Sequence, residues 1–177
     1  DKISNYRGIS LVSVFAKIYE KAFAENLKFF LSEHKLISNF QFGFRAGYST
    51  LDALLTIYKH ILESFESKQR SACFYFDLTR AFDTVNHDLL LIKLEHYWVR
   101  GTPLEWLRFY LSNRQQKVIV KGPVGHSTSS NRVVPLGVPQ GSILGPILFI
   151  IFINDLGNCF YPNQASLYAD DSTVAFR

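Results

Sequence analysis

The sequence predicts an α+β fold in which helices flank a small, largely antiparallel sheet. The order of patterns along the chain is the first reason: helices come first, then a strand, two helices, a ribbon, another helix and a hairpin. Composition is the second, because 47% of the 177 residues are hydrophobic, which is enough to form one compact core. The third is that no internal repeat or low-complexity tract interrupts these patterns.

Two helices are predicted in the first part of the chain. Ser49-Thr50-Leu51-Asp52 is a capping box that opens the second of them, with an apolar stripe that continues to Phe65. Between the two helices, glycines on both sides of Arg45 predict a loop, over residues 41–48, that can approach a ligand closely. The first helix spans residues 14–31, where apolar side chains recur at helical spacing: Phe15, Ile18, Ala22, Phe23, Leu27, Phe30 and Leu31.

A strand and two helices follow. Residues 72–77 are apolar on both faces, which predicts a central strand covered on both sides. A helix is expected over residues 86–97 and is closed by Gly101. The next helix has Pro103 in its first turn and runs to about Leu111.

The last part of the chain contains a ribbon, a helix and a hairpin. Residues 117–135 are strand-like with Gly, Ser and Asn breaks, and a turn over 136–142 leads into an apolar helix over 143–156. That apolar segment is too short to cross a bilayer, which needs ~20 residues, so no membrane contact is expected. Residues 165–169 and 172–176 predict a hairpin with Asp170 and Asp171 at its tip.

The basic charge is concentrated in two segments. The net charge is +4 overall, and residues 1–45 and 101–135 are basic, while 46–100 and 136–177 are acidic. Such a distribution permits a polyanionic partner, although solvated Lys and Arg on helix faces are an equally good interpretation of any one residue.

The two cysteines and the first residues of the chain suggest in which compartment the protein lies and whether the chain is a fragment. Cys73 and Cys159 lie in apolar surroundings with no pairing pattern, which predicts buried free thiols in a reducing compartment. No signal peptide is visible, so an intracellular location, in the cytoplasm or the nucleus, is expected. Because the chain begins with Asp1 and has no methionine, we expect an excised domain or a fragment.

Three aspartates are the strongest candidates for chemistry. Asp77 ends the strand over 72–77, and Asp170 and Asp171 follow an apolar segment. Carboxylates gathered in apolar surroundings need a counter-charge, and a divalent metal provides one. Mg²⁺ prefers oxygen ligands, and two such ions ~3.5–4 Å apart promote in-line phosphoryl transfer. Taken alone, Asp-Asp is also a common turn sequence.

Five motifs occur in order over nearly the whole chain, and together they are much more specific than Ala-Asp-Asp alone. They are Asn5-Tyr6-Arg7-Gly8-Ile9-Ser10-Leu11, Gln41-Phe42-Gly43-Phe44-Arg45, Phe76-Asp77-Leu78 through Asp83-Thr84-Val85, Gly137-Val138-Pro139-Gln140-Gly141-Ser142 with Ile143-Leu144-Gly145-Pro146, and Tyr168-Ala169-Asp170-Asp171. The chain thereby resembles the reverse transcriptases of non-LTR retrotransposons of the LINE type. Leu111-Ser112-Asn113-Arg114-Gln115 is also similar to this subgroup.

The resemblance implies a right-hand polymerase, with a fingers-like region over 1–70 and a palm over 71–177 that contains an inserted helix and ribbon at about 101–135. It also implies two Mg²⁺ ions, with Mn²⁺ as a substitute. Asp77 and Asp170 would hold both metals, the carbonyl of Leu78 would help, and Asp171 would support the catalytic site. Expected partners are an RNA template, a DNA primer, dNTPs and the remainder of a polyprotein with a thumb and an endonuclease.

The resemblance also implies a nucleotide site. Arg45 would bind the triphosphate as a bidentate donor, and Gln140 and Gly141 would line the pocket. Phe82 would exclude a 2′-hydroxyl and so favour dNTPs, whereas without the motif it would be an ordinary core aromatic. Asp83 is expected to be structural, bonding the turn before the helix over 86–97.

Departures from the family pattern limit these expectations. Gly8 stands where the family often has Pro, and the later palm segment and the thumb are not in the chain. The main hypothesis is the fingers and palm of an RNA-directed DNA polymerase that is weak or inactive in isolation. A non-catalytic RNA-binding remnant of a retroelement is the alternative. A viral RNA-dependent RNA polymerase is disfavoured because it normally has a smaller or polar group at the position of Phe82.

Overall fold

The computed structural model describes residues 8–123 and 125–177, so Asn5, Tyr6 and Arg7 of the first motif lie outside the described residues. Its main helices are α1 (Val14–Glu33), α2 (Thr50–Glu66), α3 (His87–His96), α4 (Thr102–Leu111) and α5 (Gly145–Phe152). Its strands are β1 (Ala72–Asp77), β2 (Gln115–Gln116), β3 (Ile119–Gly122), β4 (Gly125–Thr128), β5 (Arg132–Val133), β6 (Gln164–Tyr168) and β7 (Asp171–Phe176). Short 3-10 helices cover Ala81–Thr84 and Leu156–Phe160.

Polar side chains begin three of the helices. The predicted capping box of α2 is confirmed, because the Ser49 backbone N–H donates to Asp52 Oδ2 at 2.7 Å and Ser49 Oγ accepts from the Asp52 N–H at 3.4 Å. Ser13 caps α1 and Asn86 caps α3 with a side-chain oxygen that accepts one backbone N–H, from Ala16 and from Leu89. These caps satisfy backbone donors that have no partner inside the helix, which is why the helices begin where the sequence predicts.

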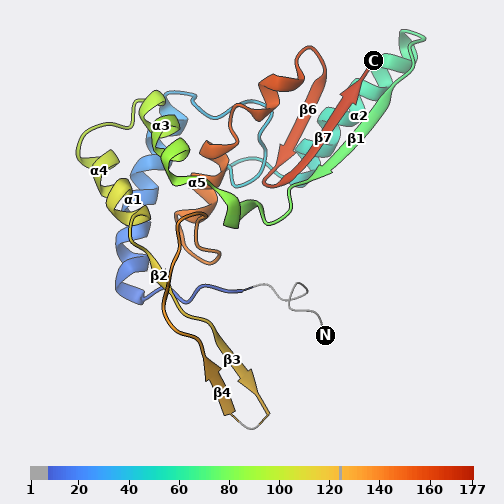
Figure 1. The fold of residues 1–177 in the computed structure, drawn as a ribbon. Coiled ribbons are helices and arrows are strands. Elements are labelled where there is room, and N and C mark those ends of the chain that lie inside the picture. Colours follow the sequence, from blue (N-terminus) through green and yellow to red (C-terminus); the bar gives the residue numbers. More distant parts are fainter. Residues whose placement is uncertain (1–7, 124) are drawn as a thin grey trace.

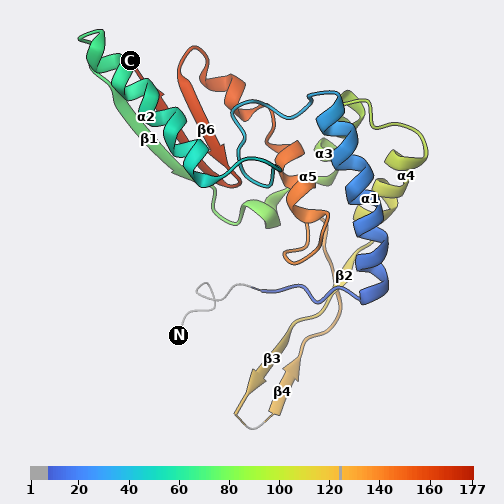
Figure 2. The same ribbon diagram turned by 180° about the vertical axis from the view of Figure 1, so that it is seen from behind.

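The three-stranded antiparallel sheet has the order β1-β7-β6 (Figure 1). Helix α2 packs along β6 and β7, as both views show, and Arg177 at the end of β7 forms an ion pair with Glu63 of α2 (Figure 2). The prediction that residues 72–77 form a central strand is wrong. β1 lies at the edge of the sheet and most of it is exposed, because α2 covers the other two strands.

The main core lies beside the sheet, where α1, α3, α4 and α5 pack together (Figure 1). Helix α5 is its centre and is apolar on all sides, as expected of a helix that other elements surround. None of the helices within the described residues is both long and apolar enough to cross a lipid bilayer. The largest fully buried apolar side chains of this core are Leu90, Leu94, Leu107, Leu111, Leu144, Ile147, Leu148, Phe149 and Ile151.

Three further expectations need correction. The helix predicted over 143–156 is shorter, because α5 ends at Phe152 and Asn154 then turns its side chain to the Leu36 carbonyl and the Tyr97 hydroxyl, both at 2.8 Å. Cys159 is exposed rather than buried, and Cys73 is half-buried, although both thiols are free. On α1, Phe15 and Ile18 are 78% and 60% exposed, so the buried face starts further along the helix than predicted.

The predicted β-ribbon is present and projects away from the rest of the molecule (Figure 1). Its outer part is the antiparallel pair β3–β4, and its inner part is the short pair β2–β5. All described residues from Gln115 to Val133 are exposed.

Candidate active site

Two of the three predicted aspartates face each other across the sheet. Asp77 is the last residue of β1, Asp171 is the first of β7, and the two are direct partners in the antiparallel register. Such partners have Cβ atoms ~4.5–5.5 Å apart on one face of a sheet, so both side chains start side by side. Both residues are exposed. Like charges directly opposite are unfavourable, and a cation between them would offset this repulsion.

Asp170 occupies the adjoining turn. Tyr168 pairs with Asp171, which leaves Ala169 and Asp170 as the two-residue connection between β6 and β7. Ala169 has a φ of 57°, in the left-handed region that non-glycine residues rarely adopt. The expectation that Asp170 and Asp171 share the tip of the hairpin is therefore wrong, because Asp171 is already the first residue of β7, but all three aspartates lie at one end of the sheet.

The donor set fits a divalent metal, although the side chains do not form a ready cluster. Within residues 8–123 and 125–177, no three His, Cys, Asp or Glu side chains converge closely enough to hold a metal ion. Carboxylate oxygens are the ligands that Mg²⁺ prefers, and exposed side chains change rotamer within nanoseconds. The predicted carbonyl ligand, Leu78 O, accepts from the Ala81 N–H at 3.2 Å and keeps a second lone pair.

Arg45 is used locally in the loop between α1 and α2. Its Nη1 donates to the Ser38 and Gln41 carbonyls, both at 2.9 Å, and its guanidinium lies over the Tyr48 ring at 4.3 Å. Arginine has five N–H donors, so Nη2 and Nε are left to meet a ligand. The structure therefore shows Arg45 holding the loop together, a role that the sequence did not indicate.

The Phe82 ring is fixed by two other aromatic rings. It lies in the 3-10 helix after β1 and stacks on Phe149 of α5, with ring centroids 4.5 Å apart. The Phe44 ring meets it edge-on at 6.3 Å. Phe82 is half-buried, so the ring belongs to the margin of the core and keeps an accessible part.

The segment with Gln140 and Gly141 is bonded to the chain after β1. Gln140 Nε2 donates to Asp83 Oδ1 at 3.1 Å, and the Val138 N–H donates to the Phe82 carbonyl at 2.8 Å. Gly137 has a φ of +87°, and a Cβ there would come within 2.8 Å of the Asp83 backbone. The Asp83 side chain thus bonds this distant segment and not the turn before α3, where the sequence predicted its bond.

Sequence reasoning missed Gln41 as a positioning residue. Its side chain is 0% exposed, and Oε1 accepts from the backbone N–H of Gly43 at 2.8 Å and of Ala169 at 3.2 Å. A Cβ on Gly43 would lie 2.3 Å from the Ala169 nitrogen, so only glycine allows this contact. Gln41 thus links the Arg45 loop to the turn that contains Asp170. The one feature of the sequence that could have indicated this role is the position of Gln41 at the start of the second motif.

Glu20 is a second missed residue. It is 2% exposed on α1, and Oε2 accepts from the Ile143 N–H at 2.7 Å while Oε1 accepts from the Tyr110 hydroxyl at 3.0 Å. Burial, together with the Glu20 charge, raises the pKa of Tyr110 to about 12. Glu20 thereby holds the chain just after Gly141. The signal was a charged residue in register with the buried face of α1, which also contains Ala24, Leu27 and Leu31.

A cleft between other elements lies away from the three aspartates. It has a volume of about 390 Å³ between α3, α4 and the end of the ribbon, and residues that line it include Asn86, His87, Arg108 and Leu136. None of the three aspartates lines it. Asp77 and Asp171 are exposed and Asp170 is half-buried.

Comparison with known proteins agrees with this architecture. A family model described as "Reverse transcriptase (RNA-dependent DNA polymerase)" matches residues 1–177. The chain is 36% identical to "Probable RNA-directed DNA polymerase from transposon BS" of Drosophila melanogaster, over 97% of this chain and 19% of that protein. It is 33% identical to "RNA-directed DNA polymerase from mobile element jockey" of the same organism, again over 97% of this chain and 19% of that protein.

The fold is similar to that of a telomerase. The superposition on telomerase from Candida albicans has a TM-score of 0.62 at 15% identity and covers 86% of this chain and 30% of that one. This likeness confirms the predicted right-hand polymerase fold. The family match over the whole chain and the identity to the retrotransposon proteins confirm the predicted family. The chain therefore belongs to the reverse transcriptase (RNA-dependent DNA polymerase) family.

Proposed function

We propose that this chain supplies the fingers and palm of an RNA-directed DNA polymerase. The protein would add dNTPs to a primer 3′-hydroxyl by in-line attack on the α-phosphate, with release of pyrophosphate. The observation that carries the proposal is the pairing of Asp77 with Asp171, with Asp170 in the adjoining turn. A primer end and a nucleotide phosphate could meet over these three carboxylates.

Reverse transcriptases generally use divalent metals, and we propose two Mg²⁺ ions here, with Mn²⁺ as a substitute. Asp77 and Asp170 would hold both, the Leu78 carbonyl would add an oxygen, and Asp171 would support the pair. Such ions neutralise the charge that develops on the attacking and leaving oxygens. The chain itself would supply the positions of these groups: β1 presents Asp77, the hairpin presents Asp170, and Gln41 bonds the backbone of Ala169, next to Asp170.

The nucleotide would lie between the Arg45 loop and the segment with Gln140 and Gly141. Arg45 would offer Nη2 and Nε to phosphate oxygens while Nη1 holds the loop. Phe82 would meet the sugar. We propose the fingers-like region for residues 1–70 and the palm for 71–177, with α2 of the former packed on the palm sheet.

An RNA template, a DNA primer and dNTPs are the proposed partners, together with the rest of a longer polyprotein. The chain spans 19% of the length of the retrotransposon proteins named above, so their further segments would supply a thumb and other domains. The basic charge of residues 1–45 and 101–135 supports contact with the nucleic acid.

The test uses the full-length protein that contains this chain. Asp170→Asn should reduce dNTP incorporation on a primed RNA template by at least about 100-fold, because one charged ligand is lost where charge develops. The matched control is Asp88→Asn, an exposed aspartate of α3 away from the sheet, which should leave incorporation unchanged. Undiminished synthesis by Asp170→Asn would refute the metal assignment. Template binding by the unmodified protein without any incorporation would support the non-catalytic remnant instead.

A further inference from the structure

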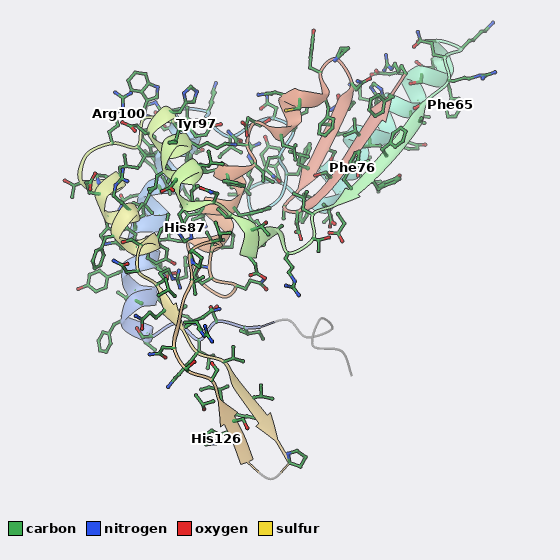
Figure 3. All side chains as sticks on the ribbon, in the orientation of Figure 1. Phe65, Phe76, His87, Tyr97, Arg100 and His126 are labelled. Atoms are coloured by element: carbon green, nitrogen blue, oxygen red, sulfur yellow. The ribbon has the colours of Figure 1, made fainter. Side chains whose placement is uncertain are left out.

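The ribbon over residues 114–134, here called the basic ribbon, has no role in the site described above. It projects from the molecule, with His126 near its far end (Figure 3). Two strand pairs build it, and the Val134 N–H closes its base on the Arg114 carbonyl at 2.8 Å. Its backbone is well bonded, but its side chains between Gln115 and Val133 are exposed wherever the structure describes them.

The charge of this region has one sign. Residues 106–154 contain five Lys and Arg residues and no Asp or Glu. Four of the five lie on the basic ribbon: Arg114, Lys117, Lys121 and Arg132. Lys117, Lys121 and Arg132 form no ion pair with any described residue. The positive charge of the basic ribbon is therefore not neutralised by acidic residues nearby in the sequence or by ion pairs of these three side chains with described residues.

The register sorts the side chains onto two faces. Lys121 pairs with His126 and Ile119 pairs with Thr128, so the strand alternation places Lys117, Lys121 and His126 on one face. The opposite face has Val118 and Val120, with Ser127 across from Val120. The face with the two lysines thus also carries Ile119 and Thr128, whereas the other face has valines with Ser127 and no charged residue.

An isolated two-stranded hairpin is only marginally stable in water, so this arm is expected to rest on a partner. Its charge favours a polyanion. Between Tyr110 and Phe149 the sequence has no Phe, Tyr or Trp, and proteins that bind unpaired bases stack them on such rings. The chemistry therefore fits the phosphate backbone of a nucleic acid rather than its bases.

The basic ribbon is firmly attached to the proposed nucleotide site. After β5 the chain runs directly into residues 136–141, where the Gly137 N–H donates to the Val85 carbonyl and its own carbonyl bonds His87 Nε2, both at 2.8 Å. Figure 3 shows His87 at this base. From Val133 to Gly125, across β5 and β4, an extended chain reaches at most roughly 26 Å at ~3.3 Å per residue. That distance corresponds to about eight nucleotides of a strand, at ~3.4 Å each.

We propose that the basic ribbon binds the phosphate backbone of the template–primer through Lys117 and Lys121, at a distance of up to about eight nucleotides from the primer end. This inference rests on the proposed function. Binding should be independent of sequence and sensitive to salt. It would hold the nucleic acid in line with the three aspartates while each nucleotide is added.

Binding of a template–primer to the full-length protein, measured by fluorescence anisotropy over a range of salt concentrations, tests the proposal. Lys117→Gln with Lys121→Gln should lower the slope of log K against log salt by about 1.5, because each lost phosphate contact removes ~0.7–0.9. The matched control is Lys59→Gln with Lys68→Gln, which removes the same charge from exposed positions on and after α2, outside the two basic segments, and should leave the slope unchanged.

A series of lengths locates the contact. The duplex and the template overhang are lengthened separately. The salt slope of the double variant should fall below that of the unmodified protein only when the nucleic acid extends more than about five to eight nucleotides from the primer end. Equal slopes for the variant and the unmodified protein at every length would overturn the inference. Loss of a protein partner or of self-association in Lys117→Gln with Lys121→Gln, with the salt slope unchanged, would likewise overturn it and assign the arm to a protein. Because dNTP incorporation on short template–primers is measured separately, either result leaves the proposed function standing.

Discussion

The packing of Phe82 bears on its proposed contact with the sugar of the nucleotide. With sixteen phenylalanines in the chain, a half-buried Phe is by default a core residue, and its stacking on Phe149 fits that view. Phe44 on another side of the ring limits its movement. A ring held in this manner cannot swing aside to admit an extra hydroxyl group, so its packing and its proposed contact with the sugar are compatible.

Phe82→Val should raise the use of rNTPs relative to dNTPs by about tenfold or more, because a smaller side chain leaves room for the 2′-hydroxyl. The measurement is the ratio of kcat/KM for matched rNTP and dNTP on one template–primer, in the full-length protein. Phe29→Val is the control, since Phe29 is exposed on α1. A ratio unchanged in Phe82→Val would remove the proposed selection of the sugar.

At the scale of elements, the decisive contact joins the loop after α1 to the β6–β7 hairpin. The Phe42 N–H donates to the Leu167 carbonyl at 2.8 Å, and the Leu167 N–H donates to the Phe40 carbonyl at 2.7 Å. The buried Gln41 side chain adds the bond to the turn itself. Because backbone and side chain both cross this contact, the Arg45 loop and Asp170 are held in one geometry.

Gln41→Met should lower kcat for dNTP addition by about tenfold or more, with a smaller change in KM, since the turn loses its acceptor while the volume is kept. Gln41→Glu keeps an acceptor oxygen but buries a carboxyl group without a counter-charge, so it should lower the melting temperature while retaining more of the rate than Gln41→Met. Nε2 of Gln41 has no partner among the described residues, so this exchange breaks no hydrogen bond there. Steady-state kinetics and melting temperatures of both variants check this. A kcat loss that follows the melting temperature alone would contradict the positioning role.

For the whole molecule, the notable feature is the amount of exposed apolar surface. Leu54, Leu55, Tyr58 and Phe65 are exposed on α2, and Figure 3 shows Phe65 near one extremity of the molecule. Helix α1 has a comparable face with Phe15 and others. Surfaces of this kind mark contacts with other protein segments.

The isolated 177 residues should therefore show weak or no processive synthesis and should self-associate. Primer extension and size-exclusion chromatography, run beside the full-length protein, measure both properties. Long DNA products from an isolated chain that remains monomeric would show that the apolar faces of α1 and α2 need no contact with further protein segments.

The sequence by itself determined the features that depend on neighbouring residues or on the order of motifs. The capping box at Ser49 predicted the start of α2, and five ordered motifs predicted the family and the right-hand fold. Strand pairing, burial and long-range bonds were decided by the tertiary structure. β1 is an edge strand because strand order and the position of α2 are properties of the assembled sheet.

The positioning residues show the same division. Gln41 bonds a residue 128 positions away and Glu20 one 123 positions away, and no local pattern specifies such partners. The three aspartates could be predicted as site residues from the sequence because a carboxylate can bind a metal ion whatever the fold around it. The pairing of Asp77 with Asp171 needed the folded sheet, since register fixes which side chains meet.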